Sequence, residues 1–160
     1  YQHLLERAVR EARGEKLERW TPDINVGLGG RIPPDWIPEA DTRLSLYLRL
    51  ARLTSRGELD AFEEELVDRF GEEPEEAAIL LRIANLRTLA RDADIAKVDA
   101  GPSAIAFTPR SETTKRSIAA ADLVARNGRL LLEASIASPV DRLVQVEKVL
   151  SSLSKGRKRA

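Results

Sequence analysis

The sequence predicts an α+β fold: a single domain in which helices pack against short antiparallel strands. Apolar residues recur at intervals of three and four over residues 41–91, which is the spacing of amphipathic helices. They alternate with polar residues over residues 95–108, which is the spacing of strands. The chain has 160 residues, 42% of them apolar, so its length and composition fit one domain with an ordinary core.

Three segments precede the central helices. Residues 1–18 have helical spacing and predict a linker-like helix over residues 1–19. Residues 23–32 predict a strand, in which the glycines of GLGG at 27–30 indicate a bulge or a close approach of the backbone. RIPPDWIP at 31–38 contains three prolines and predicts an extended, ordered connector. Three apolar side chains are expected to anchor this connector: Ile32, Trp36 and Ile37.

Three consecutive helices are predicted for the middle of the chain. The first follows an N-cap at Asp41, and a turn over residues 54–57 separates it from the second, over residues 58–70. Gly71 follows the second helix where a left-handed C-cap belongs. The third, over residues 74–91, is apolar nearly all round and is predicted to be the central core helix. The inward-facing residues of the second helix are predicted to be Leu59, Phe62, Leu66 and Phe70.

After residue 92 the apolar pattern changes from helical to alternating. The sequence predicts a hairpin, a short helix, a turn at Asn127 and Gly128, a further strand and a last helix that opens at Pro139. Residues 155–160 are expected to form a frayed, basic end. The strands are predicted over residues 95–100, 104–108 and 130–136, and the short helix over residues 118–125. The apolar residues expected on one face of the last helix are Leu143, Val146, Leu150 and Leu153.

Composition argues against several kinds of chemistry. Cysteine is absent, which excludes disulfides, thiolate nucleophiles and cysteine metal sites, and the single histidine is His3. The chain has no GxxxxGK[ST] phosphate loop, and no nucleophile has an arguable orienting base. We therefore expect no catalysis from this chain by itself, no cofactor and no metal. No window approaches about 18 consecutive apolar residues, so no membrane-spanning helix is expected.

Charge is balanced overall but unevenly distributed. Lys+Arg and Asp+Glu both number 26, yet residues 57–78 hold ten acids and one base, Arg69. From Gly101 onward there are eleven bases and five acids. KGRKR at 155–159 has the charge to touch phosphates but lacks interleaved aromatic residues for base stacking, so we expect it to shift no duplex DNA.

The second helix is the most informative element for function. Glu65, Asp68 and Arg69 lie away from its apolar stripe, related by three and four residues. One interpretation is a solvated surface, in which Glu65 and Arg69 form a salt bridge of ~0.3–0.5 kcal/mol. The other is a docking surface that attracts a basic partner and rejects acidic ones such as DNA. Composition gives the two interpretations equal weight.

Five stretches in register resemble one family, the C-terminal domain of the bacterial transcription-repair coupling factor (Mfd). The similarity covers about residues 1–100, and residues 1–5 resemble the helix that leaves the motor domain in that family. Beyond Gly101 the resemblance is limited to the order of the predicted elements, a hairpin followed by helices. The stretches are RIPPDWIP (31–38), ADTRLSLYLRLA (40–51), ELVDRFGEEPEEA (65–77), RIANLRTLA (82–90) and IAKVDA (95–100).

The resemblance implies a non-catalytic regulatory domain spanning residues 1–160 of a cytoplasmic DNA translocase. Members of the family dock on a UvrB-like N-terminal module, mask the surface that binds UvrA and hold the motor repressed. The family's charged docking residues match Glu65, Asp68 and Arg69 here. The resemblance also implies that the longer protein binds RNA polymerase, UvrA and DNA, and that its motor uses ATP and Mg²⁺. A chain without methionine that starts at Tyr1 is expected to be a piece of such a longer product.

An alternative function is a general protein-interaction module that binds RNA polymerase or another repair protein. A pull-down with the UvrB-like module supplied in trans distinguishes this alternative from the regulatory domain.

Overall fold

Helices and a mixed sheet make up an α+β fold, as the sequence predicts. The computed structural model describes residues 5, 20–117 and 123–159. The five strands are β1 (Asp23–Asn25), β2 (Ile95–Ala100), β3 (Ala104–Pro109), β4 (Val124–Arg126) and β5 (Arg129–Glu133). Their order in the sheet is β1-β2-β3-β5-β4. The helices of the described residues are α2 (Ala40–Arg52), α3 (Arg56–Phe70), α4 (Glu75–Asp92), α5 (Glu112–Ser117) and α6 (Pro139–Arg159).

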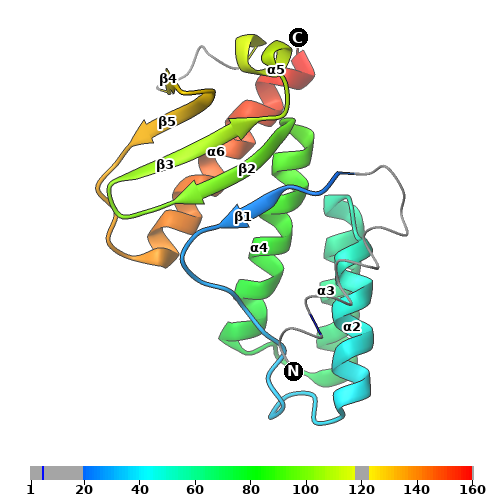
Figure 1. The fold of residues 1–160 in the computed structure, drawn as a ribbon. Coiled ribbons are helices and arrows are strands. Elements are labelled where there is room, and N and C mark those ends of the chain that lie inside the picture. Colours follow the sequence, from blue (N-terminus) through cyan, green and yellow to red (C-terminus); the bar gives the residue numbers. More distant parts are fainter. Residues whose placement is uncertain (1–4, 6–19, 118–122, 160) are drawn as a thin grey trace. The chain divides into compact units, whose positions relative to one another are not determined.

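Contacts within the domain group its residues into two compact units. The first holds Gly30–Asn85 with the described residues up to Trp20, and the second holds Thr21–Gly29 with the described residues from Leu86 onward. Figure 1 shows α2 and α3 side by side in the first unit and α6 along one face of the sheet in the second.

The core of the first unit forms between the connector, α2, α3 and the first part of α4. Three of the four residues predicted to face inward from α3 are buried, namely Leu59, Phe62 and Leu66. The fourth, Phe70, is partly buried and packs against this cluster. The buried set is Ile32, Ile37, Leu46, Leu50, Leu59, Phe62, Leu66, Leu81 and Ala84. This confirms the predicted direction of the α3 stripe, and it leaves the opposite face of α3 in solvent.

The proline-rich connector is ordered and anchored as predicted. Ile32 and Ile37 are buried, and the Ile32 N–H donates a hydrogen bond to the Tyr47 Oη at 2.7 Å. The Trp36 Nε1–H donates to the Phe70 carbonyl oxygen at 2.9 Å, and the two rings meet edge to face with centroids 6.0 Å apart. The connector is thereby fixed to both α2 and the end of α3.

At Gly30 the backbone that leads into the connector passes close to the backbone of α4. A Cβ at this position would lie 2.1 Å from the Leu80 backbone nitrogen and 2.5 Å from the Glu76 carbonyl oxygen. The next residue, Arg31, donates its N–H to the same carbonyl at 3.2 Å. Of the two alternatives predicted for GLGG, a bulge or a close backbone approach, the structure shows the close approach at Gly30, against α4.

In the second unit α6 packs its apolar stripe toward the sheet. Its four predicted inward residues are all buried, as are Phe107 on β3 and Leu130 on β5. The β2–β3 hairpin is present with the predicted turn, and Asn127 and Gly128 both have positive φ (52° and 76°), as a two-residue hairpin turn requires. The buried stripe residues of α6 are Leu143, Val146, Leu150 and Leu153.

The predicted first strand is too long and its sheet is not wholly antiparallel. The strand ends at Asn25, because the Asn25 Oδ1 accepts a hydrogen bond from the Gly27 N–H at 3.3 Å and Gly27 has φ +81°. β1 pairs with β2 in parallel, with Ile24 opposite Val98. A parallel pair needs a long crossover connection, and here the connector and α2–α4 supply it.

Several predicted boundaries also change. Residues 124–125 belong to β4 rather than to a helix, since pairing with β5 overrides their helical spacing. The last predicted strand ends at Glu133, and α6 continues through residues 155–159, where a frayed end is predicted. The first N-cap is Glu39 instead of Asp41, which lies in the first turn of α2. The predicted helix over residues 1–19, apart from residue 5, lies outside the described residues, as do His3 and residues 118–122.

Candidate docking surface on α3

Local interactions fix both ends of α3. The Ser55 Oγ accepts a hydrogen bond from the Glu58 N–H, and the Glu58 carboxylate accepts from the Ser55 hydroxyl and the Thr54 N–H, each at 3.2 Å. At the other end the Gly71 N–H donates to the Val67 carbonyl oxygen at 2.9 Å. Gly71 has φ 88° and ψ −169°, a conformation that is essentially restricted to glycine. The helix thus starts two residues earlier than predicted and ends at the predicted glycine.

Glu65 is held by two arginines. Arg49 of α2 donates to both carboxylate oxygens, at 2.7 Å and 2.8 Å, and Arg69 donates to one of them at 3.0 Å. The guanidinium carbon of Arg49 lies 5.1 Å from the centre of the Phe62 ring, and that of Arg69 lies 4.7 Å from the Phe70 ring. Hydrogen bonds from Arg49, and then from Arg69, lower the pKa of Glu65 to about 2. This Arg49–Glu65–Arg69 cluster keeps Glu65 ionised and links α2 to α3.

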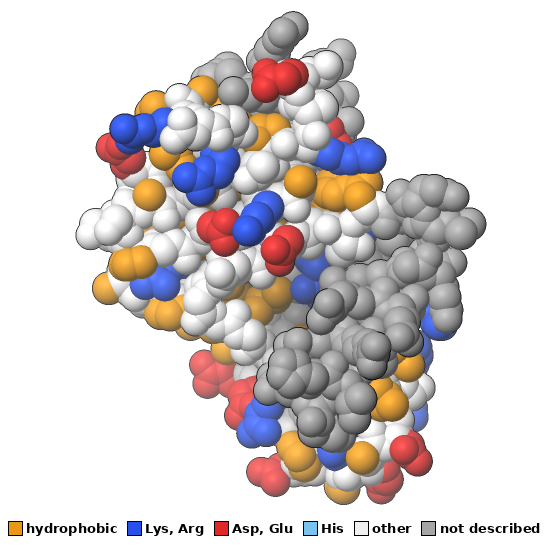
Figure 2. All heavy atoms as spheres, viewed as in Figure 1, with side chains coloured by type: hydrophobic (Ala, Val, Ile, Leu, Met, Phe, Trp, Pro, Cys, Tyr) orange, Lys and Arg blue, Asp and Glu red, His pale blue; other side chains and the backbone are white. Residues whose placement is uncertain are grey.

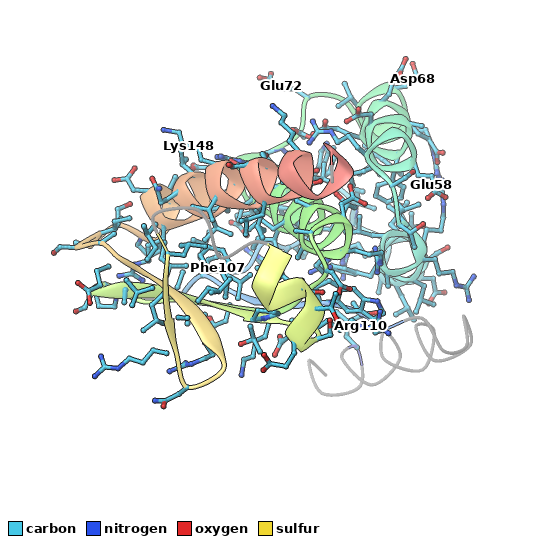
Figure 3. All side chains as sticks on the ribbon, turned by 90° about the horizontal axis from the view of Figure 1, so that it is seen from above. Glu58, Asp68, Glu72, Phe107, Arg110 and Lys148 are labelled. Carbon is cyan, nitrogen blue, oxygen red and sulfur yellow. The ribbon has the colours of Figure 1, made fainter. Side chains whose placement is uncertain are left out.

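A groove on the outer side of α3 gathers most of the remaining acids. It is open, has a volume of about 670 Å³, and contains Val67, whose side chain is 43% exposed. Figure 3 shows the Asp68 side chain directed away from the core. Among the described residues, the Asp68 carboxylate has neither a hydrogen bond nor an ion pair. This acidic groove is lined by Asp60, Glu63, Glu64, Val67, Asp68, Glu72 and Glu73.

One carboxyl group of the acidic groove is partly buried. Glu73, on the turn after Gly71, lines the groove together with Glu63 of α3. Its Oε2 is buried and has no hydrogen-bond partner among the described residues. Burial, followed by the proximity of Glu63, raises the pKa of Glu73 to about 7.

Comparison with known proteins identifies the family. A family model described as the TRCF domain matches residues 26–119, more than half of the chain. The chain belongs to the TRCF domain family. The matched residues of this TRCF domain include the whole of α3, the Arg49–Glu65–Arg69 cluster and the acidic groove.

Three curated relatives of this TRCF domain carry the same name. The transcription-repair-coupling factor of Escherichia coli is 38% identical over 105 residues, which is 62% of this chain and 9% of that protein. The protein of the same name from Haemophilus influenzae is 36% identical over 107 residues, 63% of this chain and 9% of its own length. That from Myxococcus xanthus is 28% identical and covers 96% of this chain, but only 14% of its own length. The chain therefore spans a small part of each relative.

A solved structure has the same fold as this TRCF domain. It is the crystal structure of the C-terminal domain of transcription-repair coupling factor, with a TM-score of 0.64 and 17% identity. The match covers 86% of this chain and 97% of that one.

The TRCF domain places its three predicted docking residues in two neighbouring surfaces. Glu65 and Arg69 form the predicted salt bridge, but the bidentate partner of Glu65 is Arg49, 16 residues earlier. Asp68 faces the acidic groove instead. The sequence pattern did not reveal Arg49 or the place of Glu73 in the groove, because each depends on how two different elements lie together. The turn at Gly71 is a local signal that Glu73 lies beside the end of α3.

Other parts of the described residues carry no comparable acidic site. These residues hold no group of three or more His, Cys, Asp or Glu side chains arranged to bind a metal ion. No helix in the part of the chain that the structure describes is long and apolar enough to cross a membrane. Figure 2 shows acidic and basic side chains interspersed over the sheet on the face in view, unlike the acidic groove, whose lining contains no base.

Proposed function

We propose that this TRCF domain is the non-catalytic regulatory domain of a transcription-repair coupling factor, in which it docks on a UvrB-like N-terminal module. In this proposal docking masks the surface that binds UvrA and represses an ATP-dependent DNA motor elsewhere in the longer, cytoplasmic protein. Engagement of RNA polymerase releases the contact. Glu65, Asp68 and Arg69 are the proposed docking residues.

The acidic groove is the observation that carries the proposal. Six carboxyl side chains surround one exposed valine, and no base lies among them. A small apolar centre with a charged rim is the usual anatomy of a protein interface, and a rim of one sign selects a partner of the opposite sign. The same charge repels DNA, so the groove favours a basic protein surface.

The Arg49–Glu65–Arg69 cluster supports the proposal in a second way. The side chains of Glu65 and Arg69 remain 36% and 48% exposed, so both are accessible to a partner beside Asp68. The hydrogen bonds and ring contacts of the cluster hold these charged groups in fixed positions, which lowers the entropy lost on docking.

A charged contact of modest area suits a reversible repressor. When the regulatory domain and the UvrB-like module belong to one polypeptide, their effective concentration is ~mM. Even a weak interface between them is then largely occupied. Such an interface is also easily released by a competing partner, and salt weakens it.

Replacing two groove acids tests the proposal. We expect Glu64→Gln plus Asp68→Asn to weaken binding of the 160-residue chain to the UvrB-like module, supplied in trans, by about tenfold at low salt. The loss should shrink as salt is raised. Isothermal titration at two salt concentrations measures it. Glu39→Gln is the matched control, since Glu39 is an exposed acid outside the groove whose side chain makes no cap hydrogen bond.

The same idea makes a prediction for the longer protein. Glu65→Ala plus Asp68→Ala should raise both UvrA binding and ATPase activity while leaving the isolated fold within about 1 kcal/mol of wild type. Equal affinity for the groove variant and for wild type would contradict the proposal. Binding to RNA polymerase without binding to the UvrB-like module would favour the general interaction module instead.

A further inference from the structure

The hairpin formed by β4 and β5 ends the sheet on one side. β4 is the outermost strand in the order β1-β2-β3-β5-β4, and Figure 1 shows it at the opposite edge from β1. All three of its residues are exposed, and Val124 is 56% exposed, more than any other large apolar side chain of the described residues. The matched family model ends at residue 119, so the match does not cover this hairpin.

Two arginines face each other across the hairpin turn. Arg126 of β4 pairs with Arg129 of β5, and the turn between them holds Asn127 and Gly128. Like charges directly opposite each other destabilise a sheet, so the pair is a local conflict within the fold. Both side chains are exposed, and within the described residues neither guanidinium has a hydrogen bond or an ion pair. A carboxylate brought by another molecule would relieve the repulsion.

The two arginines share one face of the sheet with an exposed valine. Neighbouring residues of a strand point to opposite faces, and Leu130 is fully buried. Arg129 and Leu131 therefore lie on the face away from this core. Their partners in the register, Arg126 and Val124, lie on the same face. This edge of the sheet thus combines an accessible apolar side chain with two cations.

The backbone of β4 also has free hydrogen-bonding capacity. In a hairpin with a two-residue turn, the residues that flank the turn bond to each other, here Arg126 and Arg129. Successive pairs alternate, so the next residue of β4, Ala125, directs its N–H and C=O away from β5 to the free edge. No strand among the described residues pairs with this side of β4.

We propose that the free edge of β4 binds an extended, acidic segment of a partner protein, which adds to the sheet as a further strand. Main-chain hydrogen bonds to Ala125 supply affinity. Side chains two residues apart on the added strand supply specificity: a carboxylate beside Arg126 and Arg129, and an apolar side chain beside Val124. This surface belongs to the second unit and includes no residue of the acidic groove, so it goes beyond the docking proposed above.

The same face of the sheet disfavours a nucleic-acid strand. Glu133 of β5 and Asp99 of β2 lie on the face that carries the arginines, and their carboxylates repel phosphate groups. Stacking of bases requires an aromatic ring, but Phe107, the only aromatic residue of the described strands, is buried on the other face. The arginines therefore favour the carboxylates of a protein.

A short peptide in which threonine alternates with glutamate and valine is the probe. Added to the isotope-labelled 160-residue chain, it should change the amide shifts of β4 and β5 and slow the hydrogen exchange of the Ala125 amide. A peptide with lysine in place of glutamate should bind about tenfold more weakly. Equal binding of the two peptides, or no shift changes at millimolar acidic peptide, would overturn the proposal.

Two variants separate the backbone from the side chains. Ala125→Pro removes only the outward N–H, a change that edge strands tolerate, and should abolish binding. Arg126→Gln plus Arg129→Gln keeps the backbone and should weaken binding about tenfold. Lys148→Gln, at an exposed cation on α6, is the matched control and should bind the peptide as wild type does.

Unchanged amide signals of α6 show that each variant is folded. Binding of the acidic peptide by folded Ala125→Pro at wild-type affinity would overturn strand addition. If Ala125→Pro loses the hairpin, the double arginine variant decides, because wild-type affinity in that variant would also overturn the proposal. Binding of duplex DNA at β4 without binding of the acidic peptide would overturn it in favour of a nucleic-acid partner.

Discussion

Gly30→Ala is expected to lower the free energy of unfolding by about 3–5 kcal/mol. The added methyl group would lie 2.1 Å from the Leu80 nitrogen, 2.4 Å from the Leu80 Cα and 2.5 Å from the Glu76 carbonyl oxygen. These are backbone atoms of a helix, so no side-chain rotation relieves the clash. The connector has to move away from α4, and the Arg31 N–H then loses its hydrogen bond to Glu76.

Gly29→Ala is the matched control for this substitution. The adjacent glycine has no heavy atom within 4 Å of an added Cβ, so the change should alter stability by less than about 1 kcal/mol. Urea unfolding of both variants, followed by far-ultraviolet circular dichroism, gives the comparison. Equal midpoints for the two variants would show that the backbone approach at Gly30 is wrong.

Leu66→Ala is expected to cost about 2–5 kcal/mol, because it removes a side chain that is 2% exposed from the core of the first unit. Val67→Ala, at the next position of the same helix, should stay within about 0.5 kcal/mol, since Val67 is 43% exposed in the acidic groove. Thermal melts of the two variants measure the difference. A smaller loss for Leu66→Ala than for Val67→Ala would mean that α3 presents the opposite face to the core.

Local patterns predicted much of the fold. The direction of the α3 stripe, the glycine that ends it and the β2–β3 hairpin each depend on residues within one helical turn or one hairpin. The ordered connector was predictable too, because its prolines restrict the backbone and Trp36 supplies an apolar ring that packs against the core. The GLGG run predicted a bulge or a close approach of the backbone, but it did not indicate that Gly30 is the glycine involved or that it lies against Leu80.

Pairings between distant elements were not predictable from one sequence. Arg49 and Glu65 belong to different helices, so their bidentate contact depends on how α2 and α3 pack. The parallel pairing of β1 with β2 depends on the whole crossover between them. The docking residues were assigned to one surface for the same reason, whereas Asp68 lies in the groove and Glu65 beside Arg49.

The central claim is that the acidic groove is the docking face. Its most direct test is NMR mapping of the isotope-labelled 160-residue chain while the UvrB-like module is added. The account predicts that backbone amide shifts change over residues 60–73, which carry the groove, and that the strands β3 and β5 are unaffected. Changes confined to the sheet, with residues 60–73 unaffected at saturating module, would contradict it.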